Sequence, residues 1–229
     1  TSRQNYEKYK NTKSNKKDVE IFEKKFETYI NEIQKKINTK KELSFLHSGH
    51  IGDVINVLPV IKELSKKYKC DLYLGVNRPM DKAGNIYLDE KIFKMLLPLI
   101  NTQKFINKIE VYKNQDIDIN FDIIRELPIN LLFDNSRYGF HIAGVQTKSD
   151  EVFLDVKPHN EITDKIVIQR SLKYQNHFIN YRFLNSFDDV FFIGTKNEYK
   201  DLNKQIKNLK FYNCKDFLEM AMIIKSSRL

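Results

Sequence analysis

Short apolar runs and longer amphipathic segments follow one another along the chain, a pattern that predicts alternating strands and helices. The apolar runs predict strands at 43–46, 71–76, 108–112, 130–133, 152–156, 165–169, 189–193 and 210–212. Apolar residues three or four positions apart predict helices at 18–36, 54–68, 91–106, 140–145, 177–186, 198–206 and 216–225. Residues 121–125 fit either a short helix or a strand. In the last helix the same spacing predicts a buried face made of Phe217, Met220, Ala221 and Ile224.

This alternation predicts an α/β protein with mostly parallel sheets and helices on both faces. A polar stretch with a proline at 157–164 interrupts the pattern, which then starts again, so we expect two Rossmann-like domains at 43–160 and 161–229. Residues 1–42 precede them, with a polar segment that is disordered or a linker and then the amphipathic helix. The sequence stops at Leu229, where another strand is expected, which predicts an incomplete second domain.

The turn after the first predicted strand carries the clearest candidate chemistry. It contains Gly49, His50 and Gly52, and Asp53 follows where a helix begins. Glycines allow a sharp bend and a close ligand, and the new helix directs free N–H groups toward the turn. Ligands of doubly wound domains sit at this end of the strands. Asp53 is therefore predicted to be either a general base or a helix cap, and His50 either a ligand contact or an exposed loop residue.

Polar and basic residues also follow two other predicted strands. After the strand at 130–133 come Asn135 and Arg137. These two residues fit a contact to a bound substrate, such as the acceptor of a transferred group, and a turn equally well. After the strand at 165–169 come Arg170, Ser171 and Lys173. The forked donors of Arg170 suit a diphosphate, and the structural alternatives are pairing with Asp164 or a solvated side chain.

A glycine turn follows the predicted strand at 189–193. It consists of Gly194 and Thr195, with Glu198 three residues later. The spacing of Thr195 and Glu198 fits a capping box with a purely structural role, and a ligand contact of Glu198 at the end of this strand is the functional alternative.

Charge and cysteine content narrow the function classes. The net charge is +9 and the pI about 9.3, but basic and acidic residues are interleaved, which favours a solvated surface over nucleic-acid binding. Anionic substrates or lipids stay compatible with this charge. No apolar run approaches the length of a membrane span. The Cys and His spacing resembles no zinc motif, so we expect no metal site and two reduced cysteines, Cys70 and Cys214.

The residues from Ser48 to Val54, followed by Leu58-Pro59, resemble the start of the ADP-heptose:lipopolysaccharide heptosyltransferases of glycosyltransferase family 9. The strand that leads into Arg170-Ser171 and the turn at Gly194-Thr195 add to the resemblance, which covers 43–229. It implies a GT-B fold and sugar transfer from a nucleotide-sugar, ADP-linked in this family, without a metal or other cofactor. It assigns Asp53 as the general base, Arg170 or Lys173 to the donor phosphates and Glu198 to the nucleoside. The family's glycine-rich donor loop is expected just beyond Leu229.

Two function hypotheses follow. The first is a cytoplasmic glycosyltransferase at the inner face of the membrane, with a glycan or glycolipid acceptor, such as lipopolysaccharide, and a basic surface that meets anionic lipid. The second is a non-catalytic α/β module that binds a nucleotide or nucleic acid, which would show steep salt dependence. The lack of aromatic-basic clusters counts against nucleic acid as the partner.

Overall fold

The computed structural model describes residues 16–79, 84–126, 135–146, 152–172, 176 and 178–228. For residues 16–20, 22, 23, 124–126 and 135–137 it describes the backbone alone. The chain forms two compact units, Thr1–Phe93 with Gln103–Leu154 and Lys94–Thr102 with Asp155–Leu229. Helix α4 (Glu90–Asn101) passes from the first unit into the second. The predicted domain boundaries at residues 42 and 160 stay predictions.

The first unit is built on a four-stranded parallel sheet. Its strands are β1 (Glu42–His47), β2 (Lys69–Leu74), β3 (Lys108–Val111) and β4 (Ile119–Asn120), in the order β3-β2-β1-β4. The register places Phe45 of β1 between Leu72 of β2 and Ile119 of β4. All three side chains are buried, so β1 is the centre of the core. The two-residue strand β4 was not predicted, because it is too short to produce a periodic pattern.

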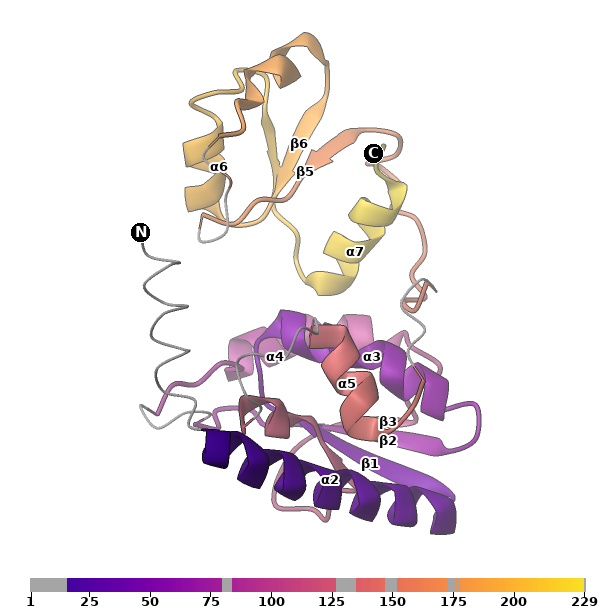
Figure 1. The fold of residues 1–229 in the computed structure, drawn as a ribbon. Coiled ribbons are helices and arrows are strands. Elements are labelled where there is room, and N and C mark those ends of the chain that lie inside the picture. The colour runs from indigo at the N-terminus through magenta and orange to yellow at the C-terminus, as the bar shows by residue number, and fades with distance from the viewer. Residues whose placement is uncertain are drawn as a thin grey trace. The chain divides into compact units, whose positions relative to one another are not determined.

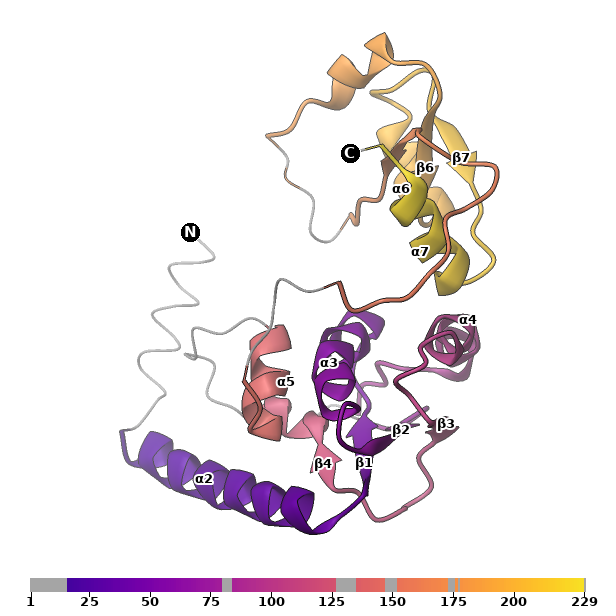
Figure 2. The ribbon, with the colours of Figure 1, turned by 90° about the vertical axis from the view of Figure 1, so that its right-hand side faces the viewer.

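Helices cover this sheet. On one face lie α3 (Ile51–Leu64) and α5 (Asn135–Ala143), whereas α2 (Lys16–Thr39) runs along the β4 side on the other (Figures 1 and 2). Between β4 and α5, residues Phe121–Glu126 form a 3₁₀-helix, η1. The Tyr29 hydroxyl of α2 donates to the Asn120 carbonyl and accepts from its N–H, at 3.1 and 2.9 Å. These bonds satisfy the backbone of the short edge strand β4.

The second unit contains a three-stranded parallel sheet. Its strands β5 (Ile166–Ile168), β6 (Val190–Ile193) and β7 (Lys210–Tyr212) are ordered β5-β6-β7. The connections contain the 3₁₀-helix η2 (Tyr181–Ser186) and α6 (Lys196–Leu202), and α7 (Phe217–Ser226) follows β7. Val190, Phe192, Leu202 and Ile206 form one buried cluster, and Ile162, Ile193 and Ile223 form a second.

The three strands of the second sheet, β7-β6-β5, follow the same order as β3-β2-β1 of the first. In the second sheet Arg228 makes a parallel bridge with Ile166, and its N–H donates to the Lys165 carbonyl at 2.8 Å. Arg228 therefore lies beside β5 on the side away from β6, as β4 lies beside β1. In the first sheet the strand order reverses between β1 and β4. In the second sheet a single bridge residue, Arg228, occupies the corresponding position beside β5.

The structure confirms an α/β protein with two parallel sheets and corrects three local predictions. Residues 152–156 form no strand, and the predicted helix at 177–186 is the 3₁₀-helix η2. In α7 it is Ile223 that is fully buried, whereas Ile224 is 50% exposed. The predicted strand at 130–133 lies outside the described residues. Cys70 and Cys214 are both free thiols, as expected.

Candidate functional site

The turn after β1 brings four predicted residues together in the first unit. His50 is the residue before α3, with extended backbone, and its N–H donates to Asp53 Oδ2 at 3.1 Å. Asp53 is the third residue of the helix, where a carboxylate also favours the positive end of the helix dipole. The structural alternative is thus corrected in position: His50 is the N-cap residue of α3, and Asp53 accepts its N–H from the third helical position. The His50 ring stacks at a tilt on Tyr87, with 4.4 Å between ring centroids.

The two glycines of this turn have different surroundings. Gly49 is buried, and a Cβ atom there would lie 2.7 Å from His47 Cε1 and 2.8 Å from Asp53 Oδ2. Gly49 is therefore needed by the turn itself. Gly52 is exposed in the first turn of α3, and a Cβ atom there would meet nothing within 4 Å. The space beside Gly52 and the start of α3 is open, as a ligand approaching this turn requires.

Asp122 is a central residue of this region that the sequence did not indicate. The Ser48 N–H donates to Asp122 Oδ1 and the Ser48 hydroxyl to Oδ2, both at 2.7 Å. Asp122 comes two residues after β4, and Ser48 directly follows β1. The pair therefore joins the carboxyl ends of the two strands between which the strand order reverses, the usual ligand position in such sheets.

The surroundings of Asp122 keep it ionised. Burial by itself would raise its pKa, but His47 and the hydroxyl and N–H of Ser48 outweigh burial and hold the pKa below its usual value. His47 Nδ1 lies 3.4 Å from Asp122 Oδ1 and accepts the Gly49 N–H at 3.0 Å. The contact with Asp122 is an ion pair when His47 is protonated.

A guanidinium lies beside the same carboxylate. Arg78 follows β2, and its Nη1 is 3.7 Å from Asp122 Oδ2. The guanidinium also stacks over the Tyr112 ring, 5.2 Å from its centroid. Nη1 is buried and has no hydrogen-bond partner among the described residues. The carboxyl edge of the first sheet thus carries a cation next to Asp122, contributed by the chain between β2 and α4.

In the second unit the structure places Arg170 inside a contact network. Arg170 is buried, its Nη2 donates to Asp201 Oδ2 at 2.6 Å, and its guanidinium stacks over Tyr181. Arg170 is the first cause that lowers the pKa of Asp201. The structural alternative of a pair with Asp164 is wrong, because the partner is Asp201. Ser171 is half-buried beside it, and Lys173 lies outside the described residues.

The turn after β6 is a complete capping box. The Thr195 N–H and hydroxyl donate to Glu198 Oε2 at 3.0 and 2.7 Å, and the Glu198 N–H donates back to Thr195 Oγ1. Glu198 Oε1 accepts the Leu172 N–H at 3.3 Å, which ties this turn to the one after β5. Burial would raise the pKa of Glu198, but these donors and Arg170 hold it below its usual value. The structural alternative for Glu198 is confirmed.

Gly194 is required by its backbone. Its φ of +146° is one that residues with a Cβ rarely adopt, and such an atom would lie 3.0 Å from Phe192 Cε1. The structure therefore brings Arg170, Gly194, Thr195 and Glu198 together at the carboxyl edge of the second sheet. Asn135 and Arg137 begin α5, and their side chains lie outside the described part of the chain.

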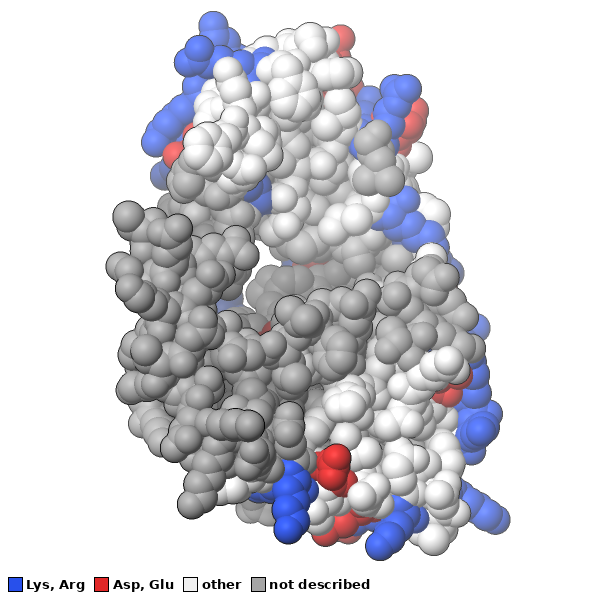
Figure 3. Space-filling model, in the orientation of Figure 1, with Lys and Arg blue, Asp and Glu red and all other residues white. Residues whose placement is uncertain are grey.

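The surface charge and the arrangement of possible metal ligands do not single out the carboxyl edge of either sheet as a binding site. On the face drawn in Figure 3, basic side chains are scattered over both units with acidic ones among them. Among the described residues no group of three or more His, Cys, Asp or Glu side chains is arranged to hold a metal ion. None of the helices within the described ranges combines the length and apolar character that crossing a bilayer requires.

Comparisons of this chain with models of protein families, with curated proteins and with solved structures find no match. The class that the fold defines is therefore the α/β class with two parallel sheets.

Proposed function

We propose that this chain is a glycosyltransferase of the GT-B type, moving a sugar from a nucleotide-sugar to a glycan or glycolipid of the cell envelope. The observation that supports this most is the repeated strand order, β3-β2-β1-β4 in one unit and β7-β6-β5 with Arg228 in the other. Each sheet has a glycine turn at its carboxyl edge, with Gly49 in the first and Gly194 in the second. Two such edges suit two substrates, an acceptor and a nucleotide donor.

In this proposal Asp53 acts on the acceptor. Its carboxylate takes the proton of the acceptor hydroxyl while that oxygen forms a bond to the anomeric carbon of the donor sugar. The bond from that carbon to the diphosphate breaks, and the nucleoside diphosphate leaves with its electron pair. The open space beside Gly52 supports an approach to this turn. A heptose-like sugar and an ADP-linked donor are the substrates that the family resemblance implies.

A second candidate is a non-catalytic nucleotide-binding module. Glu198 is compatible with it, because its carboxylate is already engaged by the capping box of α6 and by the Leu172 N–H. The pairing of Arg170 with Asp201 weighs equally on both candidates, because it leaves the guanidinium fewer donors for a diphosphate. Asp53 also serves a structural purpose as a cap. In this candidate function the carboxyl edges of the sheets bind a ligand without converting it chemically.

Calorimetric titration with ADP, UDP and GDP and their sugar derivatives tests the proposal. A transferase is expected to bind one nucleotide series and to release the nucleoside diphosphate when a glycolipid extract is added. The binding module is expected to bind without release. If no nucleotide binds at low salt, both candidates are excluded. The proposed location at the inner face of the cytoplasmic membrane is tested by sedimentation with anionic and neutral vesicles, since only anionic ones should retain a basic chain.

A further inference from the structure

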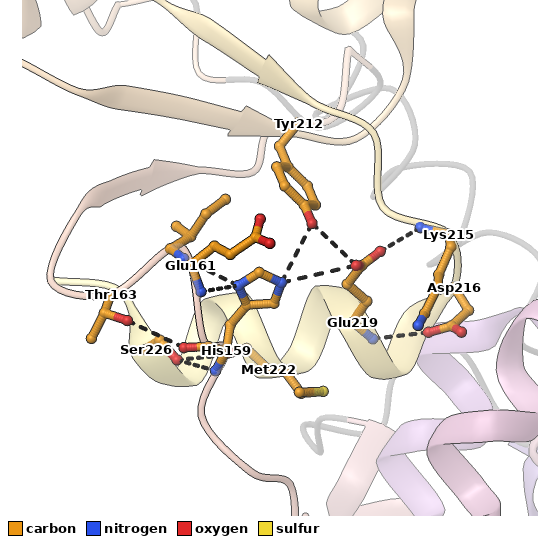
Figure 4. A network of polar contacts seen from close by, with 10 residues as sticks. His159, Glu161, Thr163, Tyr212, Lys215, Asp216, Glu219, Met222 and Ser226 are labelled. Atoms are coloured by element: carbon orange, nitrogen blue, oxygen red, sulfur yellow. Dashed lines mark hydrogen bonds and ion pairs between the residues drawn. The ribbon is translucent and has the colours of Figure 1, made fainter.

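The second unit contains a pocket that none of the predicted site residues lines. Its volume is about 210 Å³. It lies at the carboxyl end of β7 and beside α7, and Figure 4 shows the polar contacts around it. The lining residues are His159, Asn160, Glu161, Tyr212, Lys215, Leu218, Glu219 and Met222.

The His159 ring is fixed by its own turn. Its Nδ1 accepts the N–H groups of Glu161 and Ile162 at 3.2 and 3.1 Å, and the His159 N–H donates to Ser226 Oγ of α7 at 2.5 Å. With Nδ1 used as an acceptor, the proton of the neutral ring sits on Nε2. The ring is only 9% exposed, so the wall it forms is rigid.

Tyr212 and Glu219 continue this wall. Tyr212 Oη lies 3.4 Å from His159 Nε2 and donates to Glu219 Oε1 at 3.1 Å, and the Lys215 N–H donates to Glu219 Oε2 at 2.7 Å (Figure 4). Burial, then Glu219, raises the pKa of Tyr212 to about 12, so the phenol stays protonated at neutral pH.

The charges of the pocket favour a cation. Glu161 and Glu219 contribute two carboxylates against one ammonium, that of Lys215. Glu161 is exposed and its side chain makes no hydrogen bond or ion pair with the described residues, although its charge acts on Tyr212. Each carboxylate oxygen can accept about two hydrogen bonds, and Glu219 uses one per oxygen within this network. Acceptor capacity for a further donor is therefore present on both carboxylates.

We infer that this pocket binds a small ligand through a primary ammonium group. The ammonium donates to Glu161 and Glu219 and lies near the Tyr212 ring, while the remainder of the ligand contacts Leu218 and Met222. An organic ammonium fits because it needs several acceptors without the fixed coordination geometry of a metal. This site is separate from the two glycine turns, and the inference does not depend on sugar transfer.

Matched probes that differ in the ammonium group test this inference. Glucosamine and glucose, and ethanolamine and ethylene glycol, are titrated into the whole chain up to about 50 mM, well above millimolar dissociation constants. The backbone amide signals of Glu161, Ile162 and Lys215 are followed by NMR, because these N–H groups bond to the pocket network. At least one ammonium probe is expected to cause saturable shifts and to bind about tenfold more tightly than its neutral partner. Equal binding of both partners, or no saturable shift with either ammonium probe, overturns the inference.

Two variants with opposite expected effects make the test specific. Glu161→Gln removes a carboxylate without removing a contact of the fold, and should weaken binding of the ammonium probe about tenfold. Lys215→Gln removes the competing ammonium and should leave that affinity unchanged or increase it. Glu32→Gln, on the exposed side of α2, serves as the control. An unchanged affinity in Glu161→Gln contradicts the assignment, and so does a loss of similar size in the control.

Discussion

Ser48 and Asp122 lie 74 positions apart in the sequence and are joined by two hydrogen bonds of 2.7 Å. The backbone N–H and the side-chain hydroxyl of one residue both donate to the carboxylate of the other. Because Ser48 follows β1 and Asp122 follows β4, this pair connects the glycine turn to η1. The shape of the carboxyl edge in the first unit therefore depends on a charged group that the local sequence pattern does not mark.

Replacing Asp122 by Asn is expected to destabilise the chain. An amide keeps the shape but places an NH₂ group against one Ser48 donor, which costs about 2 kcal/mol of unfolding free energy at neutral pH. Urea denaturation followed by circular dichroism measures this loss. Asp116→Asn is the control, since its side chain is exposed and should change stability by less than about 0.5 kcal/mol.

The same variant should change the pH dependence of stability. The folded pKa of Asp122 lies below its ordinary value of 3.8, so its contribution is present above pH 3.8 and is lost as the pH falls through the lower folded pKa. The stability difference between wild type and Asp122→Asn should therefore shrink on going from about pH 6 to about pH 3. A difference that is constant over this range would show that the Asp122 charge plays no part.

Alanine at two glycines should have opposite effects. A Cβ atom at Gly75 would lie 2.0 Å from Ser48 Oγ, so Gly75→Ala must displace Ser48 and should cost about 1–3 kcal/mol. At Gly52 a Cβ atom meets nothing, so Gly52→Ala should be neutral or stabilise the chain by up to about 1 kcal/mol. Thermal unfolding measures both. If Gly52→Ala also weakens binding of a substrate, the open space beside it is where that substrate lies.

Arg170 is expected to matter for stability as well as for any ligand. From the sequence alone, Arg170→Ala should weaken nucleotide binding far more than stability. In the structure the side chain is buried, bonds to Asp201 and stacks on Tyr181. Arg170→Ala should therefore cost about 2 kcal/mol of unfolding free energy, read from urea denaturation. Asp201→Ala alone and the double variant complete a cycle, and additive losses would contradict a direct coupling of the two residues.

The glycine turns could be predicted from the sequence because their signals are local. A buried strand, a glycine and an amphipathic helix follow one another within 43–64, and the structure has β1 and α3 there. The capping box at Thr195 and Glu198 is equally local, since its spacing alone indicates it. Asp122 could not be found this way, because its partner Ser48 is distant and β4 has only two residues.

The predicted strand at 152–156 shows why alternation alone is insufficient. At its two ends the carbonyl groups accept from side chains instead of from a neighbouring strand. Lys62 Nζ donates to the Val152 carbonyl and Lys225 Nζ to the Val156 carbonyl, at 2.7 and 2.6 Å. Val152 is 83% exposed, whereas Val156 is buried. The alternation of apolar and polar residues indicates an extended chain, but it does not show whether a neighbouring strand is present to hydrogen-bond with it. The His159 pocket was also missed, since its members come from two distant stretches of the second unit, 159–161 and 212–222.

The central claim is that Asp53 removes a proton from an acceptor hydroxyl, and the most direct test is the transfer rate of Asp53→Asn. Asn keeps an oxygen that can accept the His50 N–H, so the start of α3 should remain folded, as checked by circular dichroism and thermal unfolding. With the nucleotide-sugar that wild type uses, nucleoside diphosphate release in the presence of the glycolipid acceptor should fall at least about a hundredfold, while donor affinity stays unchanged. A folded Asp53→Asn variant that transfers at the wild-type rate would contradict the claim.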